Sequence, residues 1–529
     1  MIVRETQTPA YWQKFAIDDR DLDYLYELFL EDDNRPRTVD DLALALVRRR
    51  CEMEEAVIER ELARGTPFQP KDGYELGEQV VFPVFGYALG SVVGVRPGNN
   101  PKYGDFEVIQ VQFEGDDRIR EFASKLDFPH KLNHEEGQSL AGGELLAPIE
   151  LYDRYGAGIR GKLLERLERG GEFVRFRNEW YLKGLLAEIH QGHLNIAEAV
   201  LDVRGVPLPA EELLRELDLP TGISPAVQVF SLNYALAEDA RFDDVGDENR
   251  SLWFLWRLEP PETVYLPPRL HYAPVLYDRG SLGEEMLRWE SNIDDELSEV
   301  PAPRTEEEVS SVTIVLSYPH RRVGTIPLTS TTEHLFPHGD NERMMIIFID
   351  GRMGKKMLGW VVRRHRYVYG LKEWYEKNDI PAGAYIQLER TDDPLAVVVD
   401  YRRRRKKREW VRVAGVERGQ LAFNMQMRSI GCDYDDLMIV GEDDRAEIDS
   451  LWKRTEEEGM SLSALMRQIF PELAKLNPQG TVHIKTLYSV INVQKRCPPG
   501  PILAELASVP SFLAVGDGYW VYDREALQA

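Results

Sequence analysis

The chain has 529 residues, of which 43% are hydrophobic and 29% charged, and its formal net charge is −25 at pH 7. These values are typical of a globular protein with apolar cores, and the length predicts roughly three to four domains. No stretch approaches the ~18 uninterrupted apolar residues of a membrane span and no signal-like run follows Met1, so we expect no membrane segment and a cytoplasmic location. Cys51, Cys432 and Cys497 are too few and too far apart for a metal knuckle, and their odd number argues against a disulfide framework.

Helices and then short strands are predicted in the first part of the chain. Apolar residues at helical spacing and a hydroxyl cap at Thr38 predict a helical domain at 1–66. Strands predict a small barrel at 67–125, with its clearest runs at 79–82, 88–95 and 106–113. This segment resembles the SH3-like barrels of transcription elongation factors and chromatin readers. A generic five-strand barrel used for protein contact is the alternative, and we predict no ligand for it.

One pattern occurs three times in the chain. The end of a helix precedes a strand that begins with Phe, a polar turn and an aromatic return strand, which is typical of the wing of a winged helix-turn-helix. The copies lie at 167–182, 236–255 and 506–521. They place a linker with a helix-plus-wing hairpin at 126–190 and a winged-helix-like domain at 429–529.

The middle copy, at 191–262, adds helices predicted at 194–201, 206–217 and 225–237. It resembles the HARE-type helix-turn-helix known from the delta subunit of bacterial RNA polymerase, chromatin regulators and restriction systems. The resemblance rests on Ile196-Ala-Glu-Ala, Gly205-Val-Pro-Leu, Trp253-Phe-Leu and Leu258-Glu-Pro260.

The charge of this winged helix favours protein contact over DNA contact. Its third helix has no Lys or Arg, and its wing carries Asp243, Asp244, Asp247 and Glu248, which would repel phosphates. After it, 263–311 is a Pro/acid-rich connector. We expect its proline- and acid-rich stretches, 260–268 and 298–308, to be extended and exposed, and they bracket a short helix predicted at 284–289.

The segment 312–428 reverses the charge of the chain. It holds 22 Lys and Arg against 13 Asp and Glu, a net charge of +9, so the rest of the chain carries −34. Strands are predicted at 312–316, 325–328, 344–349, 359–362, 384–388, 396–401 and 410–413. Between them we predict a basic loop at 317–324, a short helical turn at 331–336, a hairpin turn at Asp350-Gly351 and an amphipathic helix at 371–378. Some seven strands with two short helices predict a closed or nearly closed barrel.

Several motifs in this segment resemble the DNA-binding pseudobarrel of plant hormone-response transcription factors. They are Ile326-Pro-Leu, Glu333-His-Leu-Phe-Pro337, Phe348-Ile-Asp-Gly351 and the run that begins Gly370-Leu-Lys-Glu-Trp-Tyr. The same fold serves as a specificity domain in some type II restriction endonucleases. The resemblance implies that two loops grip the major groove of duplex DNA, one before the Ile-Pro strand and one before the longer helix.

Carried over by position, the two loops supply seven DNA-binding residues. The first loop holds His320, Arg321 and Arg322, and the second holds Arg363, Arg364, His365 and Arg366. Arginine suits the task because its planar fork bonds guanine O6 and N7, or a phosphate, in two places at once.

A run of seven basic residues follows the predicted strand at 396–401. It consists of Arg402, Arg403, Arg404, Arg405, Lys406, Lys407 and Arg408. Alternation on both flanks predicts that the run is the tip of a hairpin that projects from one end of the barrel. Such a run is typical of a nucleic-acid patch. The alternatives are a solvated loop that protects an edge hairpin from aggregation and a surface that pairs with the acidic remainder of the chain.

The sequence carries no motif for catalysis among those with a known mechanism. It has no phosphate-binding loop, dinucleotide fingerprint, zinc-protease motif or nucleophile elbow. The nearest arrangements to a nuclease site are Asp350 with Lys355 and Lys356, and Glu107 with Gln110. We interpret Asp350 as a turn residue, because Asp before Gly favours a turn through its local hydrogen bond. We therefore expect no enzyme activity, no cofactor and no metal.

Together these patterns predict a multidomain α+β protein with winged helix-turn-helix modules, a small SH3-like β-barrel and a DNA-binding β-pseudobarrel. We expect a non-enzymatic, transcription-associated regulator that grips double-stranded DNA with the pseudobarrel. Its acidic winged helices would contact RNA polymerase or another transcription or defence protein. The alternatives are the recognition subunit of a restriction or defence system, and a protein-interaction scaffold that binds no nucleic acid.

Overall fold

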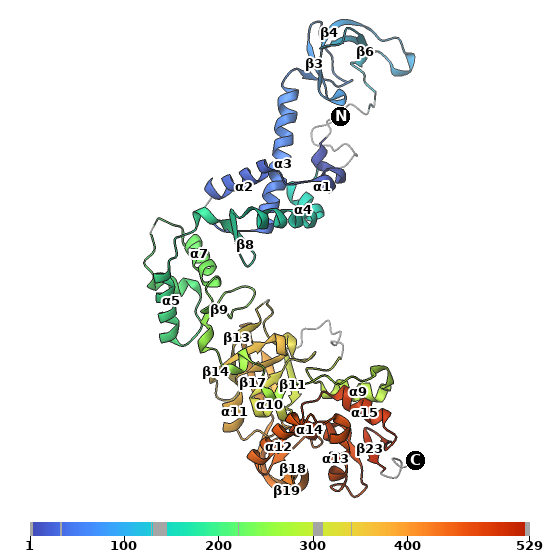
Figure 1. The fold of residues 1–529 in the computed structure, drawn as a ribbon. Coiled ribbons are helices and arrows are strands. Elements are labelled where there is room, and N and C mark those ends of the chain that lie inside the picture. The colour runs from blue at the N-terminus through green and yellow to red at the C-terminus, as the bar shows by residue number, and fades with distance from the viewer. Residues whose placement is uncertain are drawn as a thin grey trace. The chain divides into compact units, whose positions relative to one another are not determined.

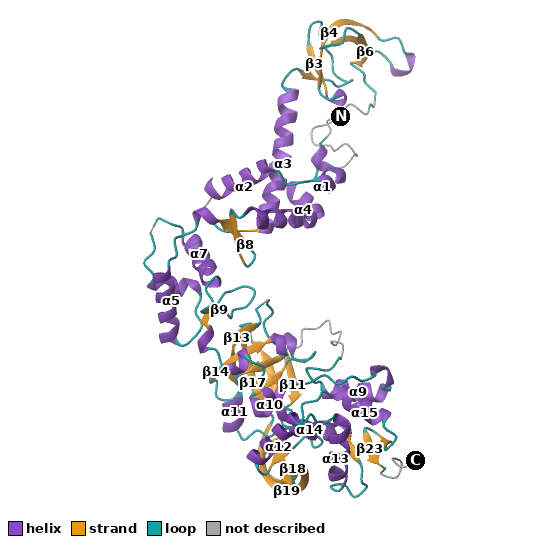
Figure 2. Ribbon diagram, in the orientation of Figure 1, coloured by secondary structure: helices purple, strands orange, loops and turns teal. Residues whose placement is uncertain are grey.

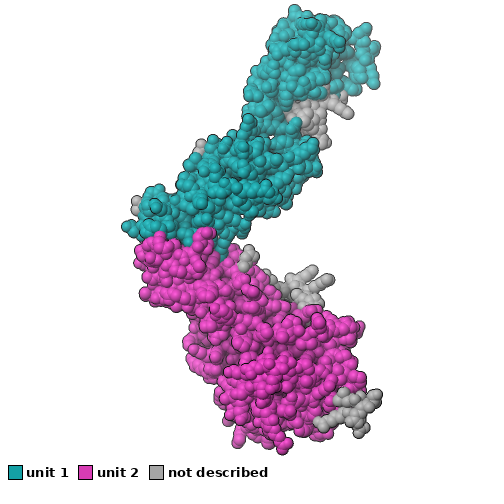
Figure 3. Space-filling model, in the orientation of Figure 1, with its two compact units in different colours: residues 1–190, 218–235 teal, residues 191–217, 236–529 magenta. Residues whose placement is uncertain are grey.

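The structure is a computed structural model that describes residues 4–31, 34–128, 130, 145–220, 222–299, 310–339 and 341–523. The chain is a mixed α+β protein, as predicted (Figures 1 and 2). It divides into two compact units: unit 1 comprises 1–190 and 218–235, and unit 2 comprises 191–217 and 236–529 (Figure 3). Among the described residues, no helix combines the length and apolar character needed to cross a membrane.

Helices build the first part of unit 1. They are α1 (Pro9–Lys14), α2 (Asp19–Glu31), α3 (Val39–Leu62) and α4 (Pro148–Gly170). Thr38 begins α3 as predicted: its hydroxyl accepts the Asp41 N–H at 3.1 Å, and the Asp41 carboxylate accepts the Thr38 N–H at 3.2 Å. The fully buried Phe29 of α2 packs edge-on against Tyr181, with ring centroids 5.5 Å apart.

Tyr181 belongs to the first of the three predicted hairpins, β7 (Phe173–Phe176) with β8 (Glu179–Leu182). The short strand β1 (Arg37–Thr38) pairs with β8. Helix α7 (Pro225–Ala237) also contributes to this core through Val227 and Phe230. The division into units therefore cuts through the segment 191–262, because most of α7 packs within unit 1.

Five strands form the β-rich part of unit 1. They are β2 (Thr66–Pro67), β3 (Gln79–Phe82), β4 (Ala88–Pro97), β5 (Glu107–Phe113) and β6 (Ile119–Ser124), in the order β2-β3-β4-β5-β6. Phe68, Phe82 and Ile109 lie in their shared core. The strands predicted in this segment are confirmed.

Unit 2 begins with α5 (Gln191–Arg204), α6 (Ala210–Leu213) and the second hairpin, β9 (Phe242–Asp244) with β10 (Trp253–Leu255). The connector follows, with α8 (Pro261–Val264) and α9 (Glu284–Ile293). The short helix near 284–289 is confirmed. The expectation that 260–268 is extended and exposed is wrong in part, because 261–264 forms α8 and Thr263 is buried. Between the two stretches, Glu290, Asp295 and Glu296 are at most 5% exposed. Residues 300–309 of the connector lie outside the described residues.

A seven-stranded sheet forms the centre of unit 2. Its strands are β11 (Ser311–Val315), β12 (Thr325–Pro327), β13 (Arg343–Asp350), β14 (Lys356–Val362), β15 (Tyr367–Tyr369), β16 (Tyr385–Arg390) and β17 (Ala396–Tyr401). Their order is β11-β16-β17-β13-β14-β15-β12. Met344, Ile346 and Phe348 alternate into its core without exposed surface, and α11 (Lys372–Lys377) buries Trp374 and Tyr375 beside them.

The sequence prediction for this sheet needs three corrections. The sheet is an open, curled half-barrel and not a closed barrel, because β11 and β12 are unpaired edges. Its seventh strand is Tyr367–Tyr369, whereas 410–413 belongs to another sheet. The predicted loop 317–324 is a helix, α10 (Tyr318–Val323), with Pro319 in its first turn and Gly324 as its left-handed C-cap.

The basic run begins the C-terminal part of unit 2. All of it but Arg402 lies in β18 (Arg403–Glu417), which pairs with β19 (Gln420–Cys432) and, over two residues, with β20 (Gly441–Glu442). The prediction that the run is a hairpin tip is therefore wrong: the turn of this hairpin lies at Arg418 and Gly419, both with positive φ.

Four helices and the third predicted hairpin complete the chain. They are α12 (Arg445–Glu457), α13 (Leu462–Ala474), α14 (Ile484–Gln494), α15 (Pro499–Ser508) and β22 (Phe512–Gly516) with β23 (Tyr519–Tyr522), to which β21 (Val482–His483) is added. Their core continues into that of α10 through Tyr318.

Candidate nucleic-acid interface

The residues predicted in the first DNA-binding loop lie inside unit 2. His320, on α10, is 1% exposed. Its Nδ1 lies 2.7 Å from Thr325 Oγ1, and its Nε2 lies 3.1 Å from Glu296 Oε2. Both ring nitrogens thus face partners within the fold.

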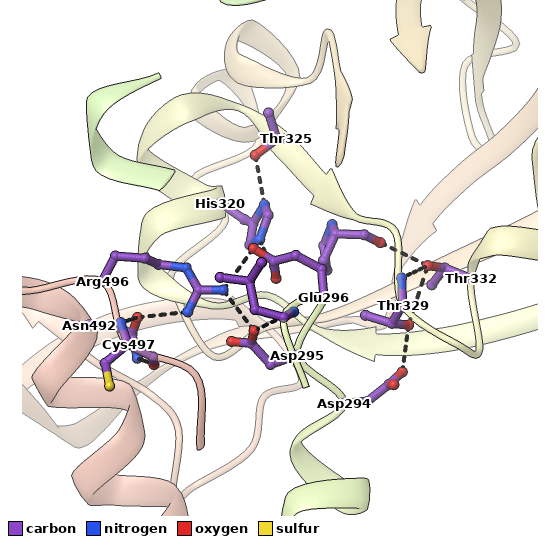
Figure 4. Close-up of polar contacts among 12 residues, drawn as sticks. Asp294, Asp295, Glu296, His320, Thr325, Thr329, Thr332, Asn492, Arg496 and Cys497 are labelled. Atoms are coloured by element: carbon purple, nitrogen blue, oxygen red, sulfur yellow. Dashed lines mark hydrogen bonds and ion pairs between the residues drawn. The ribbon is translucent and has the colours of Figure 1, made fainter. Parts of the chain in front are cut away.

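Glu296 belongs to a buried ion network that joins the connector to the C-terminal helices (Figure 4). Arg496 donates to Asp295 Oδ1 and to Glu296 Oε1, each at 2.7 Å. Although burial alone would raise it, the charges of Arg496 and His320 hold the pKa of Glu296 well below its usual range. Asp294, which directly precedes Asp295, accepts a hydrogen bond from Thr329 Oγ1 at 2.6 Å.

The two arginines of α10 are also engaged. Arg321 Nε donates to the carbonyl of Ile380, and burial lowers the pKa of this guanidinium. Arg322 donates to Tyr318 Oη at 2.7 Å and to both carboxylate oxygens of Asp449, at 2.8 and 3.0 Å. The structure therefore uses these side chains to attach α10 to its neighbours.

The second predicted loop divides into held and projecting residues. Arg363 donates to the carbonyl of Pro337 and lies 3.4 Å from Glu333. Arg364 has 69% of its side chain exposed and lies 3.9 Å from Glu342, and Arg366 is exposed. His365 stacks on Tyr367, and burial and the charge of Arg364 lower its pKa.

Part of the basic run is anchored by acidic and aromatic side chains. Arg403 lies 2.8 Å from Asp400 and over the ring of Tyr401. Arg404 pairs with Glu409 and lies over the ring of Tyr434. Lys406 lies 3.3 Å from Asp379. Arg402 lies over Tyr385, with 5.3 Å to the ring centroid. Arg405, Lys407 and Arg408 are exposed, and no carboxylate of the described chain is within ion-pair distance of them.

A cleft of about 860 Å³ lies between the β13–β14 turn and α11. We call it the basic cleft, because six cationic side chains line it against the carboxylates of Asp350 and Glu373. The cations are Arg352, Lys355 and Lys356 from the turn and its following strand, Lys372 and Lys377 from α11, and Arg403 from β18. Trp360, Tyr369 and Trp374 add aromatic surface.

Asp350 is bound into the turn. Its carboxylate accepts the N–H groups of Arg352 at 2.9 Å and Met353 at 2.8 Å, and the indole N–H of Trp374 at 2.7 Å. Burial opposes ionisation, but these donors lower the pKa of Asp350. The interpretation of Asp350 as a turn residue is confirmed. Within the ranges that the structure describes, no cluster of three or more His, Cys, Asp or Glu side chains could hold a metal ion.

Five cations of the cleft carry unbalanced charge. In the part of the chain with described coordinates, Arg352, Lys355, Lys356, Lys372 and Lys377 have no carboxylate within ion-pair distance. Sequence reasoning assigned none of them to DNA. They come from two separate segments, each of which looks like an ordinary solvated surface, and only the fold brings them together. The one local signal for this site in the sequence was the turn Asp350-Gly351 followed by Arg352, Lys355 and Lys356.

Arg403 belongs both to the basic cleft and to the basic run 402–408. It lines the cleft and is also the first residue of β18, the strand that carries the rest of the run.

Comparison of the chain with family models, with curated proteins and with solved structures gave no match.

Proposed function

We propose that this chain is a non-enzymatic protein that binds double-stranded DNA through the basic cleft. The observation that carries the proposal is the six cations against two carboxylates at one site of a protein whose net charge is −25. Clustered like charges repel one another, and a phosphate backbone is the ligand that neutralises them, with release of its counterions.

The proposed contact differs from the one that the pseudobarrel resemblance implies. Arg364 and Arg366 of the second loop project and could supplement the cleft. Arg321 and Arg322 of the first loop have partners within unit 2, so we propose no DNA role for them. His320 and Arg363 are excluded from the proposal for the same reason.

The remaining modules are proposed to contact protein. The acidic hairpin β9–β10 of unit 2 is proposed to bind a protein such as RNA polymerase or another transcription or defence protein, since its carboxylates would repel phosphates. Helix α7, most of which packs within unit 1, has no basic residue and is likewise proposed to contact protein. The five-stranded sheet of unit 1 is proposed to be SH3-like. We propose a cytoplasmic location, and the three free cysteines suit a reducing compartment.

Fluorescence anisotropy with a random duplex of roughly 30 base pairs, measured at several salt concentrations, tests the proposal. The cleft variant is R352A/K355A/K356A/K372A/K377A. The matched control, R20A/R48A/R118A/R154A/K183A, removes the same charge from exposed positions of unit 1.

We expect the cleft variant to bind more weakly and to flatten the slope of log K against log salt by about 0.9 for each phosphate that it no longer neutralises. The control should bind as the wild type does. Equal weakening in both variants would show a response to net charge alone, and failure of the wild type to bind at low salt would refute the proposal.

A further inference from the structure

The β18–β19 hairpin exposes a tryptophan. Trp410 of β18 is 65% exposed, although its neighbour in the strand, Val411, is 3% exposed. Directly across the hairpin it faces Met427, which is 36% exposed, and the next pair on this face is Arg412 with Met425. Large apolar side chains that share one exposed face mark a binding surface more often than scattered single ones do.

No contact within the described chain accounts for the position of this indole. Trp410 has no aromatic neighbour, no cation over its ring and no hydrogen-bond partner there. Trp256, the other tryptophan of comparable exposure in unit 2, is 44% exposed and lies in a short helical turn after β10. The indole of Trp410 is therefore available to a planar ligand.

The cations of the same strand indicate the charge of that ligand. Arg408 shares the face of Trp410, since alternate residues of a strand lie on one side, whereas Lys407 lies on the opposite face. Arg405 lies in the stretch where the register of β18 shifts. All three are exposed and without a carboxylate partner among the described residues. The surface thus combines a flat aromatic ring with unbalanced positive charge.

The other edge of β18, away from β19, is covered by the chain itself near Arg412, whose guanidinium donates to the carbonyls of Leu437 and Ile439 at 3.4 and 3.3 Å. The surface open to a ligand is therefore the face around Trp410 and not the edge of the strand.

We propose that the face of the β18–β19 hairpin around Trp410 binds single-stranded nucleic acid, with Trp410 stacking on an unpaired base and Arg405 and Arg408 contacting phosphates. A duplex buries the faces of its bases within its own stack, whereas a single strand presents both charge and aromatic faces. An acidic peptide would satisfy the charge but leave the indole without a planar partner. This inference extends the proposed duplex binding to a second form of nucleic acid at a separate surface.

Anisotropy with a labelled 30-nucleotide oligothymidylate and, in parallel, an oligouridylate tests the proposal and distinguishes DNA from RNA. Loss of one stacked base corresponds to about 5- to 150-fold weaker binding, equivalent to ~1–3 kcal/mol. We expect this loss for W410A, a smaller loss for W410F, which keeps an aromatic face, and none for W256A. Thermal unfolding of each variant checks that the fold is intact.

The cleft variant R352A/K355A/K356A/K372A/K377A separates the two proposals. It should lose duplex binding and retain single-strand binding, and W410A should do the reverse. The inference is overturned if neither oligonucleotide binds, if W410A binds them as the wild type does, or if polyglutamate competes as effectively as the oligonucleotides. Single-strand binding that depends on Trp410 without any duplex binding would refute the proposed function and support this inference.

Discussion

Trp374 donates its indole N–H to Asp350 Oδ2 at 2.7 Å. Trp374 is the centre of α11, and Asp350 begins the β13–β14 turn, so this buried bond joins the two walls of the basic cleft. Lys372 and Lys377 lie on the same helix as the donor, and Arg352, Lys355 and Lys356 follow the acceptor. The spacing of the cleft's cations thus depends on a hydrogen bond that lies beneath them.

The substitution W374F should weaken both the fold and the cleft. It retains most of the apolar ring but leaves the buried carboxylate of Asp350 without one donor, which costs ~1–3 kcal/mol. Urea unfolding should show this loss, and duplex affinity should fall although no cation is removed. Unchanged affinity would mean that the two walls are positioned independently of this bond.

Mutations in the two predicted DNA-binding loops should have opposite effects on stability and on duplex binding. R364A/R366A removes exposed guanidinium groups, so we expect less than ~0.5 kcal/mol change in unfolding free energy and a duplex-binding salt slope lower by about 1–2. R322A leaves the Asp449 carboxylate short of donors, so we expect ~1.5–3 kcal/mol of destabilisation with the salt slope retained. Denaturation and anisotropy on both variants check this, and the reverse pattern would restore the first loop as the DNA contact.

Glu259 should make the stability of unit 2 depend on pH. Burial, reinforced by the nearby charge of Asp243 and opposed by Arg343, raises the pKa of Glu259 to about 8. Its unfolded pKa is about 4.3, so the folded chain takes up a proton. The stability that the folded chain gains by protonating Glu259 is fully present below the unfolded pKa of about 4.3 and is lost as the pH rises towards 8.

The variant E259Q tests this dependence. Urea unfolding of wild type and variant at pH 5, 6.5 and 8 should show that the difference in stability between them changes with pH, with the wild type losing more on going to pH 8. Parallel curves would contradict a raised pKa for this carboxyl.

The network around Arg496 should be a major source of stability. R496M removes the cation and leaves Asp295 and Glu296 buried without it, so we expect ~3–5 kcal/mol of destabilisation near neutral pH. Because the folded pKa of Glu296 is depressed, its contribution is present above about pH 4.3 and is lost as the pH falls through the folded value. Denaturation at pH 7 and pH 3 should show a smaller gap between variant and wild type at the lower pH.

The strands of the half-barrel were predictable because their patterns are local. Met344 to Ile349 is an apolar run that ends at an Asp-Gly turn, and the structure has a strand and a turn there. The helix α10 was missed although its signals were present: Pro319 is tolerated in a first helical turn, and Gly324 adopts the φ of +87° that a C-cap favours. Both residue types are equally typical of a loop, so the local pattern does not distinguish the two.

The candidate site was less predictable because it depends on residues distant in sequence. His320 lies beside Glu296, and Arg322 pairs with Asp449, which is 127 positions later in the sequence. A basic residue shows its charge in the sequence but not whether the fold neutralises it. The run 402–408 was misplaced because seven charges suggest a turn, whereas all of them but Arg402 lie in β18, with a shift of register between Arg403 and Lys407.

The buried network also decides how the protein can be divided for experiments. A fragment cut at residues 312 and 428, the limits suggested by charge, would lack Glu296 on one side and Glu442, Asp449 and Arg496 on the other. His320 and Arg322 would then be left in the fragment without their ionic partners, and Tyr318 without the core that surrounds it. Any fragment meant to carry the basic cleft must therefore extend from the connector to the last hairpin, since both supply residues to the core around Tyr318.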